Sequence, residues 1–172
     1  ILAVNKDSLE RVLVKNPMIK SAQVYYSLDG YIHVNIQQRE PVLRVLTGEG
    51  YYVDRDGRVM PLSSKFTSRV VVATGDINKK FACEKLGPFA MKLKNEPFWD
   101  AYIEQLVVRS NEDVVMIPKV GDFRIVLGKV DDCEARLEKL MLFLKDGITK
   151  KGWNRYKEIN LKFDNQVVCV RK

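Results

Sequence analysis

The histidine of this chain is the first residue to test for acid-base chemistry. His33 lies between Tyr31 and Asn35, in a segment where apolar and polar residues alternate. Alternation of this kind puts it on the polar face of a strand. The sequence holds no second imidazole, so His33 can form neither a proton relay nor a histidine metal cluster. We therefore expect a surface histidine.

Three cysteines, Cys83, Cys133 and Cys169, are the thiols available for nucleophilic, redox or metal chemistry. They are too far apart to form a Cys-x-x-Cys pair, and their odd number excludes a complete disulfide framework. At most one bridge can form within the chain. Each lies in a segment of apolar pattern, where a buried cysteine behaves as a small apolar side chain. We interpret all three in that way.

Loop motifs that bind ions or phosphates are incomplete in this sequence. Asp54-Arg55-Asp56-Gly57 begins like a calcium loop, but Arg58 stands where a third oxygen ligand is needed. Gly128-Lys129 is followed by Val130 in place of Ser or Thr, so it does not close a phosphate-binding loop. Nucleophile-elbow and dinucleotide-binding patterns are absent. We expect no enzymatic activity, no metal and no cofactor, and interpret the first loop as a hairpin turn.

The composition is that of a soluble folded protein, with 46% hydrophobic and 30% charged residues. No apolar run reaches the roughly 18 residues that a membrane helix needs. Because the chain begins at Ile1 without methionine, we expect upstream sequence and place any membrane anchor there. The net charge of +7 would suit nucleic acid, an anionic membrane surface or an acidic partner, and does not choose among them. Tyr25 and Tyr26 are adjacent and must face opposite sides of a strand, so they form no base-stacking platform and nucleic-acid binding is not expected.

The first 40 residues predict a helix followed by a hairpin. Asp7 or Ser8 can cap a helix over residues 7 to 15, which Asn16-Pro17 ends. Apolar residues then alternate on both sides of Asp29-Gly30, a pair that favours a tight turn. The sequence therefore predicts a β-hairpin here.

From residue 41 the pattern changes to short strands with flanking helices. Helical segments are predicted over 78 to 103, broken at Gly87-Pro88 and before Pro97, and from Asp131 to Gly147, with an apolar stripe that should lie across the sheet. The regular spacing of the strands favours antiparallel pairing between consecutive strands. The fold class is α+β, and the predicted strands are 42–46, 51–54, 58–60, 69–74, 104–110, 113–118, 122–127, 156–163 and 166–171.

The C-terminal segment is the strongest candidate for a binding surface. Residues 159 to 163 alternate between apolar and polar, and the apolar run 167 to 170 follows beside the chain end. Such a run can be an internal core strand or a strand at the edge of a sheet, and the sequence leaves both open. An edge strand offers unpaired N–H and C=O groups to which a partner can add a strand.

Four stretches in this order resemble the FtsQ (DivIB) family of bacterial cell-division proteins, and most closely its Bacteroidetes members. They are 16–24, the junction Arg39-Glu40-Pro41-Val42, the hairpin 52–62 and the closing strands 159–170. The resemblance implies a truncated POTRA module at 1–40, which keeps only the helix and hairpin. It implies a mostly antiparallel β domain with flanking helices at 41–172.

The resemblance also implies a function. Members of the family are non-catalytic scaffolds of the division machinery, anchored by one helix in the inner membrane with these modules in the periplasm. They bind FtsB and FtsL and link to the septal synthase proteins FtsW and FtsI. An alternative with the same helix and hairpin is a POTRA-containing factor for outer-membrane assembly or secretion.

By position, the resemblance places partner binding on the last strands and the neighbouring helix start. Gly128 and the aromatic Phe163 keep the family pattern, while Gln166 and Arg171 stand where other members often have a glycine and an aromatic residue. Strand addition through the backbone tolerates such changes. The expected partner-binding residues are Lys129, Phe163, Asn165, Gln166, Val168, Val170 and Arg171.

Overall fold

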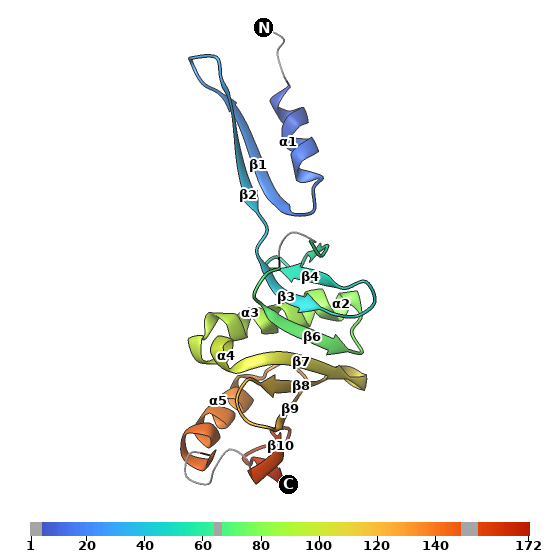
Figure 1. The fold of residues 1–172 in the computed structure, drawn as a ribbon, viewed down its shortest axis with the longest axis vertical. Coiled ribbons are helices and arrows are strands. Elements are labelled where there is room, and N and C mark those ends of the chain that lie inside the picture. The colour runs from blue at the N-terminus through green and yellow to red at the C-terminus, as the bar shows by residue number, and fades with distance from the viewer. Residues whose placement is uncertain (1–4, 64–66, 149–154) are drawn as a thin grey trace.

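The computed structural model describes residues 5–63, 67–148 and 155–172, and its strands form two sheets. A two-stranded sheet with one helix forms one end of an elongated molecule, and a nine-stranded sheet forms the rest (Figure 1). The C-terminal strand lies at the end opposite the hairpin. Helices and strands are both present, which confirms the predicted α+β class.

The N-terminal end has the helix and hairpin that the sequence predicts. Helix α1 covers Lys6–Val14, but the expected cap was wrong: Asp7 and Ser8 lie inside the helix, and the Asn5 side chain caps it by accepting a hydrogen bond from the Ser8 N–H at 3.1 Å. Strands β1, Ile19–Tyr26, and β2, Ile32–Gln38, pair antiparallel. The helix packs on β1, where Val24 is buried, whereas all seven residues of β2 are exposed.

The nine-stranded sheet has the order β11-β10-β9-β8-β7-β6-β3-β4-β5. Antiparallel pairing between consecutive strands was the wrong expectation for three neighbours, because β3 with β6, β6 with β7 and β9 with β10 are parallel. Long connections, two of them helical, lead into these parallel strands, as parallel pairing requires. The bounds are β3 Pro41–Val45, β4 Tyr51–Asp54, β5 Val59–Met60, β6 Val71–Gly75, β7 Ile103–Arg109, β8 Asp113–Pro118, β9 Arg124–Gly128, β10 Tyr156–Asn160 and β11 Val168–Arg171.

Helices form two of the three connections between parallel strands. Between β6 and β7 the chain forms α2, Lys79–Phe81, a π-helical segment Ala82–Leu86, α3, Gly87–Asn95, and α4, Pro97–Tyr102. The break predicted at Gly87-Pro88 was wrong, because proline is tolerated in the first turn of a helix and the π-helical segment runs directly into α3. The break before Pro97 is confirmed by the extended backbone of Glu96.

Helix α5, Glu134–Leu142, precedes β10 and continues as a π-helical segment to Ile148. The predicted apolar stripe is confirmed, since Leu137, Leu140 and Leu144 are buried in the core and Met141 packs against it. The same core holds the inner residues of both halves of the sheet, including Leu43 and Leu106 at 0% exposure. One continuous core therefore fixes the position of the last two strands. Within the described ranges, no helix is both long and apolar enough to cross a membrane.

Candidate protein-binding edge

Strand β11 forms one edge of the nine-stranded sheet. It pairs antiparallel with β10, and no strand in the described part of the chain pairs with its other side. The sheet therefore ends in backbone groups that no strand among the described residues uses. The opposite edge, β5, is only two residues long.

Two hydrogen bonds show which residues of β11 direct their backbone outward. The Leu161 N–H donates to the Val126 carbonyl of β9, so the backbone of Leu161 faces β9. Because backbone direction alternates along a strand, Ile159 also faces β9, and Glu158 and Asn160 face β11. They are the register partners of Val170 and Val168. The Lys172 N–H donates to the Arg155 carbonyl beside β10, which gives the same alternation from the other end of the strand.

Successive residues of a strand direct their backbone groups to opposite sides. Val168, Val170 and Lys172 face β10, and so the N–H and C=O groups of Cys169 and Arg171 face the free edge. These are the groups that a strand added to β11 would use. Neither residue is proline, so both donors are present.

The side chains of β11 divide between its two faces. Cys169 lies opposite the fully buried Ile159 and packs against the core. Val168 and Val170 face the other way and are 36% and 39% exposed. The free edge therefore carries an exposed pair of valines, which a second strand could cover.

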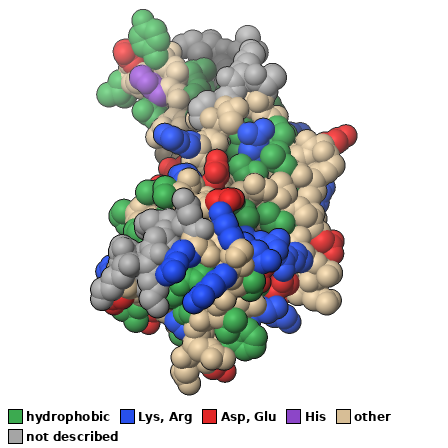
Figure 2. Space-filling view, turned by 60° about the horizontal axis from the view of Figure 1, so that its bottom comes forward, with side chains coloured by type: hydrophobic (Ala, Val, Ile, Leu, Met, Phe, Trp, Pro, Cys, Tyr) green, Lys and Arg blue, Asp and Glu red, His purple; other side chains and the backbone are tan. Residues whose placement is uncertain are grey.

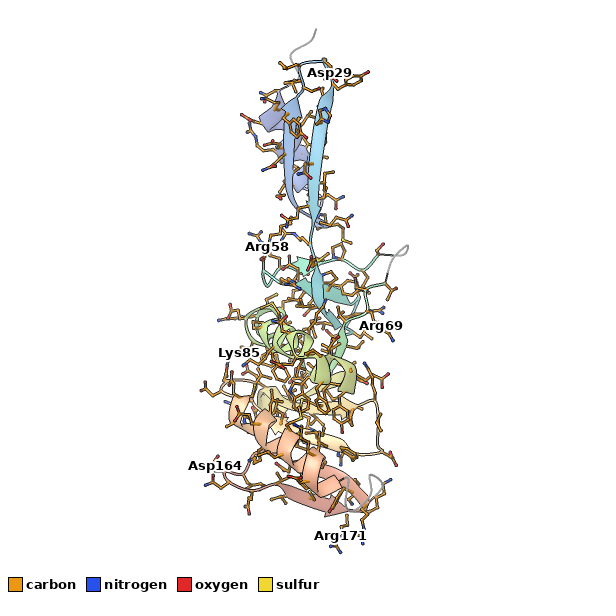
Figure 3. The ribbon with its side chains drawn as sticks, turned by 90° about the vertical axis from the view of Figure 1, so that its left-hand side faces the viewer. Asp29, Arg58, Arg69, Lys85, Asp164 and Arg171 are labelled. Atoms are coloured by element: carbon orange, nitrogen blue, oxygen red, sulfur yellow. The ribbon has the colours of Figure 1, made fainter. Side chains whose placement is uncertain are left out.

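Six of the seven residues expected to bind a partner lie in β11 or in the connection before it, whereas Lys129 follows β9 on the far side of β10. Figure 3 shows Asp164, next to Phe163 and Asn165, at one end of this region and Arg171 at the other. Phe163, Asn165 and Gln166 are exposed in the connection from β10 to β11, and Asn165 has a positive φ of 57°. Lys129 is exposed and follows Gly128 at the end of β9, which packs against the Lys162 side chain.

Residues in other parts of the chain contact both ends of the edge through hydrogen bonds and an ion pair. The Lys139 ammonium of α5 donates to the Phe163 carbonyl and to the Leu161 carbonyl. At the other end, the Lys172 ammonium lies 2.7 Å from the Asp122 carboxylate in the connection before β9. Lys139 therefore holds the backbone at the Phe163 end before any partner binds, which lowers the entropic cost of association, whereas the exposed Lys172 pair contributes little.

The surface around this edge is basic. Figure 2, which turns the C-terminal end forward, shows Lys and Arg side chains gathered there with few acidic ones. In residues 155–172 five side chains are basic and two, Glu158 and Asp164, are acidic. The Arg124 guanidinium lies 2.9 Å from Glu158. The basic side chains are Arg155, Lys157, Lys162, Arg171 and Lys172.

The three thiols, one of which, Cys169, lies in β11 itself, have little reactivity. Cys133 is 0% exposed, and Cys83 and Cys169 are half-buried, all three as free thiols. Burial raises the pKa of each, which lowers the fraction of reactive thiolate. His33 is exposed and stacks on Tyr25, with ring centroids 5.1 Å apart. Among the described residues, no three His, Cys, Asp or Glu side chains cluster as a metal site would require.

Sequence reasoning missed two features near the junction of the modules. Asp54, interpreted only as a turn residue, is a buried carboxylate that pairs with Arg39. A charged residue directly after the apolar strand Tyr51–Val53 was the available signal. The second feature is a groove between α3 and β6, whose residues lie too far apart in the chain to suggest one another.

Comparison with known protein families finds a match that covers nearly all of the nine-stranded sheet. No curated protein matches the chain. The family model described as FtsQ/DivIB, C-terminal related, matches residues 40–170, which include every strand of the nine-stranded sheet except the last residue of β11. This span is well over half of the chain and ends on the candidate edge. The chain therefore belongs to the FtsQ/DivIB C-terminal related family, which gives it a role in bacterial cell division.

Proposed function

We propose that this chain is the periplasmic part of a non-catalytic division scaffold that recruits its partners by strand addition at β11. The expected partners are periplasmic segments of FtsB-like and FtsL-like proteins, and through them the septal synthase proteins FtsW and FtsI. A single inner-membrane helix upstream of residue 1 would anchor it. The observation that supports the proposal is the free edge itself, with the backbone groups of Cys169 and Arg171 directed outward.

Strand addition suits this edge because part of its backbone is ordered before a partner binds, which lowers the entropic cost of association. The Phe163 carbonyl and Lys172 are held by Lys139 and Asp122. Each new backbone hydrogen bond contributes about 1 kcal/mol. Covering Val168 and Val170 adds apolar burial at about 25 cal/mol per Å². Backbone bonds give affinity, and the side chains at the two ends of the edge give selectivity.

The N-terminal module offers a second contact surface in this proposal. All seven residues of β2 are exposed, and its outer edge pairs with no strand among the described residues. We propose that residues 1–40 are the second half of a POTRA module and that residues 41–172 form the β domain. A partner bound at β11 and another at β2 would then sit at opposite ends of the molecule (Figure 1).

The test separates the backbone of Arg171 from its side chain. Arg171→Pro removes the outward N–H, whereas Arg171→Ala keeps it and removes only the guanidinium. Binding of a purified FtsB-like periplasmic segment is measured by biolayer interferometry. Loss of one backbone bond should weaken binding about fivefold in the proline variant, and the alanine variant should lose clearly less.

Folding of both variants is checked by circular dichroism and thermal unfolding. Because Arg171 is exposed and its N–H faces away from β10, neither change should lower the stability of the sheet appreciably. Equal binding by the wild type and by a folded Arg171→Pro variant would rule out strand addition at this edge.

A further inference from the structure

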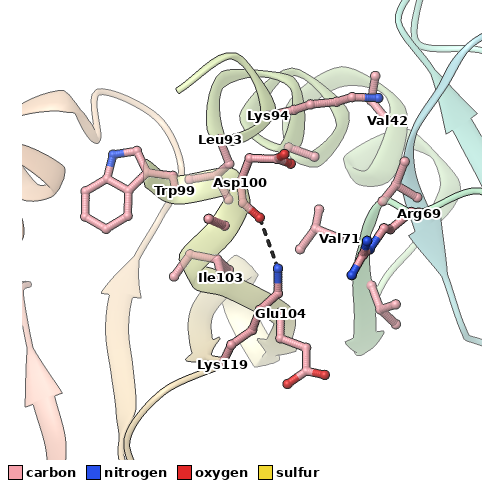
Figure 4. A pocket seen from close by; sticks show the side chains of 14 residues that line it. Val42, Arg69, Val71, Leu93, Lys94, Trp99, Asp100, Ile103, Glu104 and Lys119 are labelled. Carbon is pink, nitrogen blue, oxygen red and sulfur yellow. Dashed lines mark hydrogen bonds between the residues drawn. The ribbon is translucent and has the colours of Figure 1, made fainter. Parts of the chain in front are cut away.

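A groove of about 700 Å³ lies where α3 and α4 meet the beginnings of β3, β6 and β7. Its floor is apolar and includes Val42, Val71, Leu93, Trp99 and Ile103. This volume falls within the usual range for binding sites. Figure 4 shows Arg69 reaching over the floor from one side, with Glu104 and Lys119 on another. The groove is remote from β11, with β8, β9 and β10 between β7 and that edge.

A second hollow of about 780 Å³ continues from the groove toward the junction of the two modules. It follows the chain from Ile36 to Pro41 and is also lined by Ser68. The two hollows share two lining residues, Arg69 and Lys94. A linear ligand could therefore run from the junction, past these two cations, onto the apolar floor.

Among the described residues, unpaired basic and acidic side chains lie at different positions along this path. Arg69 and Lys94 form no ion pair with any residue that the structure describes. Asp100 and Glu104 line only the groove, farther from the junction, and their carboxylates are likewise without a cationic partner in the described ranges. Lys119 lies beside them but donates to the backbone carbonyl of Asp100 at 3.2 Å.

The junction end of the path is fixed in place. Arg39, which lines the second hollow, is held by Asp54 at 2.8 Å. Glu40 lines it too, and its carboxylate lies 2.9 Å from the Arg55 guanidinium. These pairs neutralise their own charges, so the unneutralised charge at this end comes from Arg69 and Lys94. That end is cationic, and the far end is anionic on balance, with two carboxylates, Asp100 and Glu104, against one ammonium, Lys119.

We propose that this groove is a second docking surface, which takes an extended segment of a protein partner with an acidic residue at the junction end, apolar residues in the middle and a basic residue at the α4 end. The acidic residue would pair with Arg69 and Lys94. The apolar residues would cover Val71, Leu93 and Ile103. The basic residue would pair with Asp100 and Glu104. This docking is independent of strand addition at β11.

The experiment uses three synthetic decapeptides with the same apolar centre and blocked termini. One carries Glu near one end and Lys near the other, the second carries Glu at both ends, and the third carries Lys at both ends. Each is titrated into the ¹⁵N-labelled chain. The mixed peptide should bind most tightly and shift the amide signals of residues 69–72 and 100–104 most.

Charge reversal tests the polarity of the groove. Arg69→Glu with Lys94→Glu should weaken binding of the mixed peptide about fivefold, as the loss of two exposed ion pairs predicts, and should make the peptide with two Lys the tightest binder. Lys15→Glu with Lys80→Glu is the matched control. It changes the net charge equally at exposed lysines outside the path and should leave binding unchanged.

Three outcomes would overturn the proposal. Amide shifts at residues 168–171, in place of residues 69–72 and 100–104, would show that the peptides bind at β11 and not in the groove. If the control pair weakened binding of the mixed peptide equally, the loss would be explained by the change in net charge alone. Inorganic phosphate producing the same shifts as the mixed peptide would make the cations a simple anion site. The Arg171→Pro variant should bind the mixed peptide as the wild type does, so failure of one proposal leaves the other intact.

Discussion

Arg39 and Asp54 form a buried ion pair across the junction between the hairpin module and the large sheet. The Arg39 Nη1 lies 2.8 Å from Asp54 Oδ2, and the two side chains are 11% and 2% exposed. The other carboxylate oxygen accepts the N–H groups of Asp56 and Arg58 in the β4–β5 turn. Arg39 also donates its backbone N–H to the Met18 carbonyl, before β1. One arginine therefore joins the hairpin to the turn.

Replacing Arg39 by Met should destabilise the protein. The change keeps most of the aliphatic stem and removes the charge, which leaves the Asp54 carboxylate buried with only its backbone donors. Breaking a buried pair on one side typically costs about 3 kcal/mol. We expect a loss of that size in the free energy of unfolding, measured by urea denaturation.

The matched control is Arg55→Met. The Arg55 guanidinium lies 2.9 Å from Glu40, but these side chains are 48% and 67% exposed. Exposed pairs contribute little, so the change should stay within about 0.5 kcal/mol. Equal losses in the two variants would show that burial of the Arg39 pair has no special weight.

The contact between Lys20 and Asp56 can be followed through a pKa. Lys20 belongs to β1 and Asp56 to the β4–β5 turn, with nitrogen and oxygen 2.9 Å apart. The hydrogen bond from Lys20 lowers the pKa of the Asp56 carboxyl below its ordinary value of 3.8, helped by the charges of Arg39 and Arg58. A lowered folded-state pKa stabilises the fold above the ordinary value. That contribution is lost as the pH falls through the lowered pKa.

Carboxyl-detected NMR titration should therefore place the midpoint of Asp56 below 3.8 in the wild type, and nearer the ordinary value in Lys20→Ala. Asp122 serves as the internal control, since its pKa is lowered by Lys172 instead. It should not respond to Lys20→Ala. An Asp56 midpoint that is the same with and without Lys20 would mean that the two modules do not keep this contact in solution.

Gly75→Ala tests the closest approach between β6 and β7. Gly75 has a φ of +105°, and an added Cβ would lie 2.0 Å from the Val108 carbonyl oxygen. The positive φ is unfavourable for alanine, and the methyl group would clash with the Val108 carbonyl. We therefore expect a loss of about 3 kcal/mol or more in the free energy of unfolding. Gly48→Ala is the comparison, because its φ of +58° is positive but nothing lies within 4 Å of the added Cβ. It should lose about 1 kcal/mol.

The elements of this fold were more predictable than their arrangement. Alternation located the hairpin at β1 and β2, although only β1 has buried residues. It does not fix which strand is the neighbour. The parallel pairing of β3 with β6 brings Leu43 beside Val71, after the β4–β5 hairpin has intervened. No local pattern carries that information, since the pairing depends on how the helices pack across the sheet.

The candidate edge shows the same limit. The apolar run Val167–Val170 suits a core strand as well as an edge, and only the sheet order shows that β11 is terminal. Exposure then separates Val168 and Val170 from Cys169, which faces the core. The groove was beyond sequence reasoning because Arg69 and Lys94 meet only after α3 folds back along β6. Their types alone indicate two surface cations.

Phe163→Ala should weaken binding of an FtsB-like segment while leaving the fold intact. The ring is 46% exposed in the connection before β11, and its backbone is held by Lys139 independently of the side chain. Exposed substitutions of this kind change stability by no more than about 0.5 kcal/mol. An aromatic anchor at the end of an interface contributes about 1 to 2 kcal/mol, so the dissociation constant should rise about tenfold.

The comparison variant is Leu46→Ala, an apolar side chain that is 44% exposed after β3, far from β11 in the sheet order. Because it removes a similar exposed apolar group outside the edge, its binding should equal that of the wild type. Titration calorimetry on both variants gives the two constants under one condition. If Phe163→Ala binds as tightly as Leu46→Ala, the partner does not reach the β10–β11 connection, and strand addition must rest on β11 alone.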